Sequence, residues 1–266
     1  VKMEIIRLKA KTILLFSTIA LAFFLRFYQL SDNPPGLDWD EVSNIYNGYS
    51  IAKTGRDEYK QPFPVLFRAY DAYVPGVLIY INALSSSFFG LNVMAARFPI
   101  AFLGSLSILG IYLLVSKLTA NSKWALYAAL LLAISPWHII YSRVGTIASL
   151  PIVFIIFGTY FFIRGLTLKL FLVASTFCFV MATLSYFAAY IFVPLYLFAL
   201  VVVFRKRLAY QYAVIILVII LGVALIPFVL PGGQTRLRGV SAFSDPDIIK
   251  KDTIYAAQEW GGKLLH

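Results

Sequence analysis

The sequence predicts an all-α, polytopic membrane protein with about seven transmembrane helices. Three observations support this fold class. Hydrophobic residues make up 61% of the 266 positions, charged residues make up only 13%, and apolar runs of helical length recur almost to the end. The mean hydropathy of +0.82 excludes a soluble globular domain. We expect a membrane module over residues 1–230, whose first outer loop, residues 31–98, carries interfacial helices.

Seven stretches are long enough to cross a bilayer: residues 11–30, 99–116, 124–141, 147–163, 168–183, 187–204 and 210–230. An eighth stretch, residues 76–90, is ambiguous. It has roughly 15 residues where a perpendicular span needs about 20, and it contains Asn82 and a run of three serines.

The distribution of positive charge decides how the eighth stretch is placed. The N-terminal segment is basic, which predicts that it is cytoplasmic. If residues 76–90 do not cross, the short basic loops around Lys117, Arg164 and Lys206 also face the cytoplasm; if they cross, all three loops face outward. The stretch is therefore predicted to be an interfacial or re-entrant helix. The same topology leaves Glu4 as the only cytoplasmic carboxylate among twelve.

Composition also excludes several classes of function. The net charge of +11 does not indicate nucleic-acid binding, because the basic residues stand singly or in short clusters between apolar spans. Cys178 is the only cysteine, so neither a disulfide framework nor a thiolate metal site is expected. The first apolar run lacks a cleavage site for a signal peptide and is predicted to be an anchor in the plasma membrane.

The most informative motif is the acidic cluster Asp38-Trp39-Asp40-Glu41, which lies just beyond the first predicted span. Carboxylates are scarce in this chain, with 12 in 266 residues, so three within four positions beside a bilayer need a reason. Transfer chemistry on an anionic lipid at the membrane surface supplies one.

The residues around this cluster resemble the start of the GT-C glycosyltransferases, specifically the branch similar to protein O-mannosyltransferases. The resemblance rests on Arg26-Phe27-Tyr28, on Pro34-Pro35 and on Trp39-Asp40-Glu41-Val42. Weaker matches are Arg97-Phe98-Pro99 and the segment from Ser135-Pro136 to Tyr141-Ser142-Arg143. The resemblance covers essentially the whole chain and implies the catalytic half of such an enzyme. Because these enzymes carry further spans and an outer domain, we expect a truncated polypeptide in which residues 231–266 begin a second outer loop.

The resemblance implies an inverting glycosyltransferase that moves a monosaccharide from a polyprenyl-phosphate donor to a protein or lipid/glycan acceptor. The reaction is expected on the outer face of a prokaryotic plasma membrane. The acceptor hydroxyl needs a base, and the resemblance places the catalytic aspartate of the family at Asp40, with Glu41 supporting its geometry. The departing phosphate needs cations, and Arg26, Arg97 and Arg143 map to the outer interface, where guanidinium forks suit phosphate recognition.

Two further residues are candidates for substrate binding. Asp38 forms an Asp-x-Asp pair with Asp40 that could coordinate a divalent ion, although a structural or electrostatic role is the alternative and neither a metal nor another cofactor is otherwise expected. His138 lies beside Trp137 and Tyr141 near the outer end of the third span, where it is either a substrate contact or a neighbour of the aromatic belt.

The chain departs from the family pattern at two places. Val74-Pro75-Gly76 stands where relatives usually have a basic residue before proline, and residues 145–151 lack the acid that often precedes Pro151. Two rival functions therefore stay open: a scaffold that kept the fold without catalysis, and a lipid or sugar transporter. Transporters, however, place ionisable residues at mid-bilayer, and the predicted spans hold almost none there.

Overall fold

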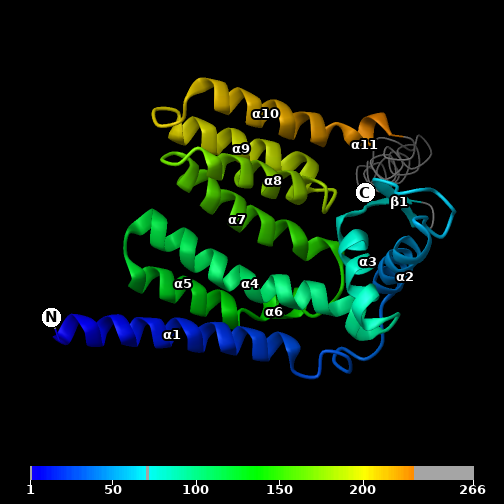
Figure 1. The fold of residues 1–266 in the computed structure, drawn as a ribbon, viewed down its shortest axis with the longest axis horizontal. Helices are drawn as coiled ribbons and strands as arrows, with labels where there is room; N and C mark the ends of the chain where they lie inside the picture. The colour runs from blue at the N-terminus through cyan, green and yellow to red at the C-terminus, as the bar shows by residue number, and fades with distance from the viewer. Residues whose placement is uncertain (1, 70–71, 231–266) are drawn as a thin grey trace, which may run out of the picture.

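The fold is a layer of roughly parallel and antiparallel helices with a smaller group of elements across one end (Figure 1). The computed structural model describes residues 2–69 and 72–230. The helices of the layer are α1 (Lys2–Phe27), α4 (Val93–Thr119), α5 (Ser122–Ile134), α6 (Pro136–Tyr141), α7 (Leu150–Gly165), α8 (Leu170–Thr183), α9 (Ala189–Phe204), α10 (Tyr210–Ala224) and α11 (Ile226–Val229). A short 3-10 turn, η1 (Ile147–Ser149), leads into α7. The predicted second outer loop, residues 231–266, lies outside the described residues.

Each of the seven predicted spans is helical, and four of the described helices are long and apolar enough to cross a membrane. These four are Lys9–Phe27, Val93–Thr119, Ile147–Gly165 and Tyr210–Val229. The other three spans are shorter: α5, α8 and α9 have 13, 14 and 16 residues. The third predicted span is divided at Ser135, because Pro136 has no N–H to continue the hydrogen-bonding of α5. The all-α membrane class is confirmed, whereas the count of seven spans is not.

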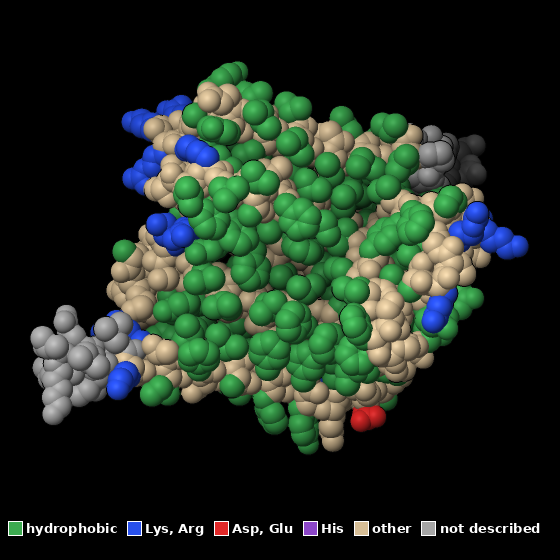
Figure 2. Space-filling model, viewed as in Figure 1, with side chains coloured by type: hydrophobic (Ala, Val, Ile, Leu, Met, Phe, Trp, Pro, Cys, Tyr) green, Lys and Arg blue, Asp and Glu red, His purple; other side chains and the backbone are tan. Residues whose placement is uncertain are grey.

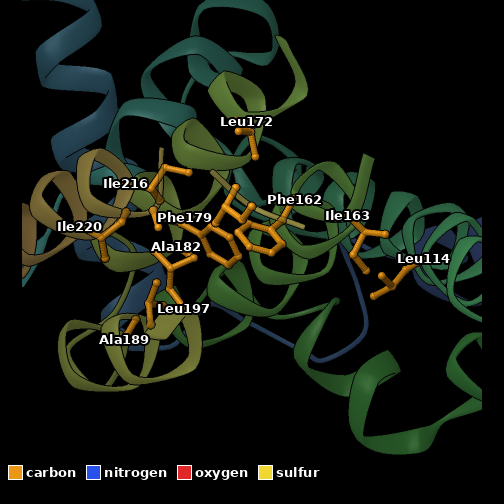
Figure 3. Packing of buried hydrophobic residues seen from close by; sticks show 13 residues of the cluster. Leu114, Phe162, Ile163, Leu172, Phe179, Ala182, Ala189, Leu197, Ile216 and Ile220 are labelled. Atoms are coloured by element: carbon orange, nitrogen blue, oxygen red, sulfur yellow. The ribbon is translucent and has the colours of Figure 1, made fainter. Parts of the chain in front are cut away.

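The largest hydrophobic core lies between α7, α8, α9 and α10 (Figure 3). Phe162 and Phe179 are fully buried at its centre, and Leu197 and Ile220 close it from the later helices. Small residues let the helices approach: a Cβ on Gly158 would lie 3.2 Å from the Phe179 ring. This close packing of small against large residues is typical of helices that associate in a membrane.

Large apolar side chains are exposed on the outside of the layer, and they cover the middle of the visible face (Figure 2). Phe16, Leu131 and Val203 are 67%, 67% and 72% exposed. Monomeric soluble proteins rarely expose contiguous apolar surface of this kind, so the exposed belt fits a lipid environment. The protein is thus a multi-pass membrane protein, as the sequence predicts.

Lysines and arginines mark one end of the layer. The start of α1 and the α4–α5, α7–α8 and α9–α10 turns all lie at the left of Figure 1, where Figure 2 shows clusters of Lys and Arg. We call this the basic end. The three basic loops and the start of α1 therefore share one side, which is the arrangement that the charge argument required.

The first long connection occupies the opposite end, which we call the α2–α3 end (Figure 1). It contains α2 (Trp39–Thr54), an antiparallel hairpin of β1 (Leu66–Ala69) and β2 (Ala72–Pro75), and α3 (Val77–Phe89). With 13 residues, α3 lies across the end of the layer instead of within it (Figure 1). Residues 76–90 thus form a helix outside the layer, as expected of an interfacial or re-entrant helix, whereas the hairpin was not predicted.

Candidate active site

The acidic motif is the beginning of α2, and its spacing is that of a helix cap. Asp38 is the N-cap residue, and its Oδ1 accepts a hydrogen bond from the Glu41 backbone N–H at 2.8 Å. The Glu41 side chain reciprocates by accepting from the Asp38 N–H at 3.1 Å. This reciprocal pair is a capping box. Asp40 lies between the two in the first turn, exposed, and its side chain makes no hydrogen bond to any described residue.

Glu41 points inward from this turn and is only 1% exposed. Its Oε1 accepts from Arg97 Nε at 2.9 Å and from the Gly145 N–H at 2.8 Å, and its Oε2 accepts from Arg97 Nη2 at 3.1 Å. Within the described residues this is the one ion pair between side chains. A buried carboxylate with four donors is fully satisfied. Glu41 therefore ties the start of α2 to α4 and to the turn after α6.

Arg97 is fully buried near the start of α4, and each of its five N–H groups has an acceptor in the chain. Two N–H groups bond Glu41. The others bond carbonyl oxygens of the segment between α1 and α2: Leu30 at 3.1 Å, Pro34 at 2.7 Å, and Gly36. Arg97 thus holds the connection whose end is the acidic motif.

Arg143 and Arg26 bind backbone oxygens in the same way. Arg143 donates to Leu25 at 2.8 Å and to Tyr28 and Asn33 at 2.7 Å, which closes the carbonyl end of α1. Burial lowers the pKa of Arg143 and the nearby Arg97 charge lowers it further. Arg26 donates to Ala22, Ala133 and Leu132 at 3.1–3.3 Å. It therefore satisfies the carbonyls left free where α5 breaks at Ser135.

His138 is buried beside Arg26 and carries a defined proton. Arg26 Nη2 lies 2.8 Å from His138 Nδ1, and because a guanidinium can only donate, Nδ1 must be the unprotonated acceptor. Nε2 then carries the hydrogen and faces Ser107 Oγ at 3.1 Å, whose own hydroxyl donates to the Gly104 carbonyl at 2.7 Å. The imidazole is therefore neutral and anchors α6 to α1 and α4.

The predicted site residues thus gather at the α2–α3 end in two adjoining groups. The first group surrounds the connection from α1 to α2 and contains Asp38, Glu41, Arg97 and Arg143. The second group contains Arg26 and His138, between α1, α5 and α6. Asp40 alone is exposed and unbonded. The roles proposed from sequence for all of these residues in catalysis or substrate binding stay predictions. For Arg97 such a role would require it to release acceptors that it already holds.

Gly145 belongs to this site and was not singled out from the sequence. A Cβ at this position would lie 2.7 Å from the Ala96 carbonyl oxygen and 3.3 Å from Glu41 Oε1. Only a glycine lets the turn after α6 bring its N–H to the Glu41 carboxylate. The only signal in the sequence is a glycine two residues after Arg143.

No group of three or more His, Cys, Asp or Glu side chains converges anywhere in the described ranges. Asp38 Oδ1 is already the acceptor of the helix cap. A divalent ion shared by Asp38 and Asp40 stays a prediction that this arrangement does not test.

Residues 74–226, more than half of the chain, match the family described as dolichyl-phosphate-mannose-protein mannosyltransferase. The chain belongs to this family. The matched residues run from β2 to α11, so Asp40 and Glu41 precede them. They include Val74 and the turn before Pro151, where the chain departs from the pattern expected of relatives.

The fold is similar to the crystal structure of the oligosaccharyltransferase of Archaeoglobus fulgidus in the apo form, with a TM-score of 0.59 and 16% sequence identity. The similarity covers 95% of this chain and 34% of that protein, so the chain spans about a third of its length. At this identity the likeness concerns the fold alone. A comparison with curated proteins found no significant match. The family match lies in the GT-C superfamily, which confirms the resemblance inferred from the sequence.

Proposed function

We propose that the protein is a GT-C glycosyltransferase in which Asp40 is the general base. It would transfer a monosaccharide, with mannose the first candidate from the family name, from a polyprenyl-phosphate carrier to a hydroxyl group of a protein or glycan. The observation that carries the proposal is a contrast within one helical turn. The side chains of Asp38 and Glu41 already form the helix cap and the buried ion pair, whereas Asp40 is exposed and free to bind an acceptor.

The proposed reaction is a single displacement at the anomeric carbon. The acceptor oxygen forms the new glycosidic bond as its proton passes to the Asp40 carboxylate. The bond from the anomeric carbon to the phosphate oxygen breaks, and its electron pair leaves with the lipid phosphate. One displacement inverts the configuration at the anomeric carbon.

Glu41 and Arg97 would act as positioning residues in this mechanism. Holding a catalytic group in a productive geometry contributes strongly to rate, and sites need support from groups whose own positions are fixed. The Glu41–Arg97 pair fixes the first turn of α2, and Arg97 also fixes the chain that leads into it. Asp40 is therefore presented by a rigid turn instead of by a loose loop.

The donor phosphate needs a cation within reach of Asp40. Arg26, Arg97 and Arg143 were predicted for this role, but they already donate to backbone carbonyls, to Glu41 and to His138. Exposed cations at the same end are Lys53 and Arg56 on and after α2, and Lys60 in the following loop. Lys53 lies 13 residues after Asp40, about 20 Å along α2 at 1.5 Å per residue, so we propose that one of the three arginines exchanges a present acceptor for the donor phosphate.

The buried charged side chains argue against a transporter. These four residues all lie at the α2–α3 end: Arg26 in the last turn of α1, Glu41 in the first turn of α2, Arg97 in the second turn of α4, and Arg143 in the turn after α6. Transport sites lie near the middle of the bilayer. A surface site suits a donor whose phosphate is fixed at the membrane plane.

The test is transfer by the purified full-length protein from a synthetic polyprenyl-phosphate mannose carrying a radiolabelled sugar. The proposal expects labelled product with inverted anomeric configuration in proteoliposomes. A folded protein that binds the donor but forms no product, with a set of peptide and glycan acceptors, would favour the scaffold. Movement of the intact donor between leaflets without transfer would favour the transporter.

A further inference from the structure

A groove of about 600 Å³ lies between α1 and α5, near the basic end. The two helices run side by side in the same direction from this end (Figure 1). Lys11 and Lys123 stand at the mouth of the groove, and Leu14, Leu126, Tyr127 and Leu130 line its walls. The groove is therefore cationic at the basic end and aliphatic along its length.

The two lysines lack counter-charges in the described part of the chain. None of the lining residues is acidic, and neither lysine forms an ion pair with a described residue. Lys123 also lies in the first turn of α5, where the free N–H groups of a helix favour an anion. Thr18 at the inner end already donates its hydroxyl to the Leu14 carbonyl at 2.8 Å. The groove thus offers positive charge at its mouth and only apolar surface behind it.

These features select an amphiphile with an anionic head. A free anion would use the lysines but leave the aliphatic walls open to water, and an uncharged lipid would leave the lysines unpaired. The basic end is where a bilayer surface would lie, because the exposed apolar belt stops there (Figure 2). Clustered lysines at such a boundary attract anionic lipids, each contributing about 1 kcal/mol.

We propose that the α1–α5 groove binds an anionic phospholipid of the adjoining leaflet. Its phosphate would lie between Lys11 and Lys123, and one acyl chain would follow Leu14, Leu126 and Leu130. The site is separate from the proposed catalytic site, since Arg26 lies 15 residues further along α1, about 22 Å at 1.5 Å per residue. The proposal therefore does not depend on the proposed function.

Occupancy should stabilise the edge of the layer. In the described chain α1 is the least buried of the four long apolar helices and packs mainly on α4 and α5. A phosphate held by a lysine from each helix would join α1 to α5 at the end opposite to the arginine-bonded carbonyls. Anionic lipid should thus raise the temperature of unfolding.

The test is native mass spectrometry of the full-length protein in neutral detergent, titrated with phosphatidylglycerol or with phosphatidylcholine of the same acyl chains. We expect phosphatidylglycerol to be retained preferentially. Lys11→Gln/Lys123→Gln should weaken its binding about thirty-fold, which corresponds to about 1 kcal/mol for each lysine. Lys123→Gln alone should weaken it about five-fold, whereas Lys117→Gln, in the same turn region but outside the groove, should change it less than two-fold.

A second variant tests the acyl chain. Leu130 is 38% exposed, so Leu130→Trp should fill the groove without disturbing the core, and it should weaken phosphatidylglycerol binding while both lysines remain. The temperature of unfolding, followed with a thiol-reactive dye at Cys178, should rise when phosphatidylglycerol is added to the wild type. It should not rise for the double lysine variant. Equal binding of both lipids, unchanged binding in the double variant, or competition by millimolar inorganic phosphate would overturn the proposal.

Discussion

Glu41→Gln should destabilise the protein, although it changes a single oxygen to an amide nitrogen. Glu41 is 1% exposed and its two oxygens accept from four N–H donors. If the amide nitrogen replaces Oε1, it faces Arg97 Nε and the Gly145 N–H; if it replaces Oε2, it faces Arg97 Nη2 and the Asp38 N–H. In both orientations two donors lose their acceptor, and Arg97 keeps a buried charge without its partner.

The size of the effect follows from that unpaired charge. Removing one partner of a buried ion pair costs about 3–5 kcal/mol of stability. The lost hydrogen bonds add nothing to this value, because they involve the same atoms. Asp40→Asn is the matched control. It makes the same chemical change one residue earlier in the chain, at an exposed side chain without a bond, and should change stability by less than about 0.5 kcal/mol.

The assay is thermal unfolding in detergent, reported by a thiol-reactive dye at Cys178, the single cysteine of the chain, which is buried. Glu41→Gln should unfold at a clearly lower temperature than the wild type, and Asp40→Asn should not. Glu41→Leu/Arg97→Met should not recover the loss, because the Leu30, Pro34 and Gly36 carbonyls and the Asp38 and Gly145 N–H groups would then lack their partners. If Glu41→Gln unfolded at the same temperature as the wild type, the buried pair would not hold the start of α2.

Two further predictions concern packing and orientation. Gly48→Ala should destabilise the protein by about 1–3 kcal/mol, because its Cβ would lie 2.9 Å from the backbone of α3; Gly222→Ala, with no atom within 4 Å of the new Cβ, should be neutral or stabilising by up to about 1 kcal/mol in the same thermal assay. In a Cys178→Ser background, an impermeant thiol reagent applied to intact cells should label Asp32→Cys but not Ser122→Cys, because the α2–α3 end is predicted to face outward; the opposite pattern would invert the topology.

The sequence was sufficient to predict the helical segments of the layer and that the basic loops share one end of it. The distribution of basic loops predicted that residues 76–90 do not span the membrane, and α3 lies across the end of the layer. Helix boundaries were not predicted where a cap was overlooked. We predicted interfacial helices within residues 31–98 without giving their bounds, whereas the start of α2 at Trp39 follows from the capping box of Asp38 and Glu41, whose Asp-x-x-Glu spacing is visible in the sequence.

The contacts within the site could not be predicted from the sequence. Glu41 meets Arg97 across 56 residues and Gly145 across 104, and no local pattern reports such pairs. The arginines were predicted to lie together at the outer interface, and the structure brings them together at the α2–α3 end. Whether they meet a ligand or the carbonyls of their own chain depends on how the connection from α1 to α2 folds back over α4, which is a tertiary arrangement.

The central claim, that Asp40 is the base, is tested most directly by the single-turnover transfer rate of Asp40→Asn in proteoliposomes loaded with a polyprenyl-phosphate sugar. Asparagine keeps the shape of the side chain but cannot take the acceptor's proton, so the rate should fall about 10²–10⁴-fold while thermal unfolding at Cys178 is unchanged. If Asp40→Asn kept most of the wild-type rate, the mechanism would be contradicted. If, in addition, Glu41→Gln lost the transfer rate at a temperature where it is still folded, Glu41 would be the base instead.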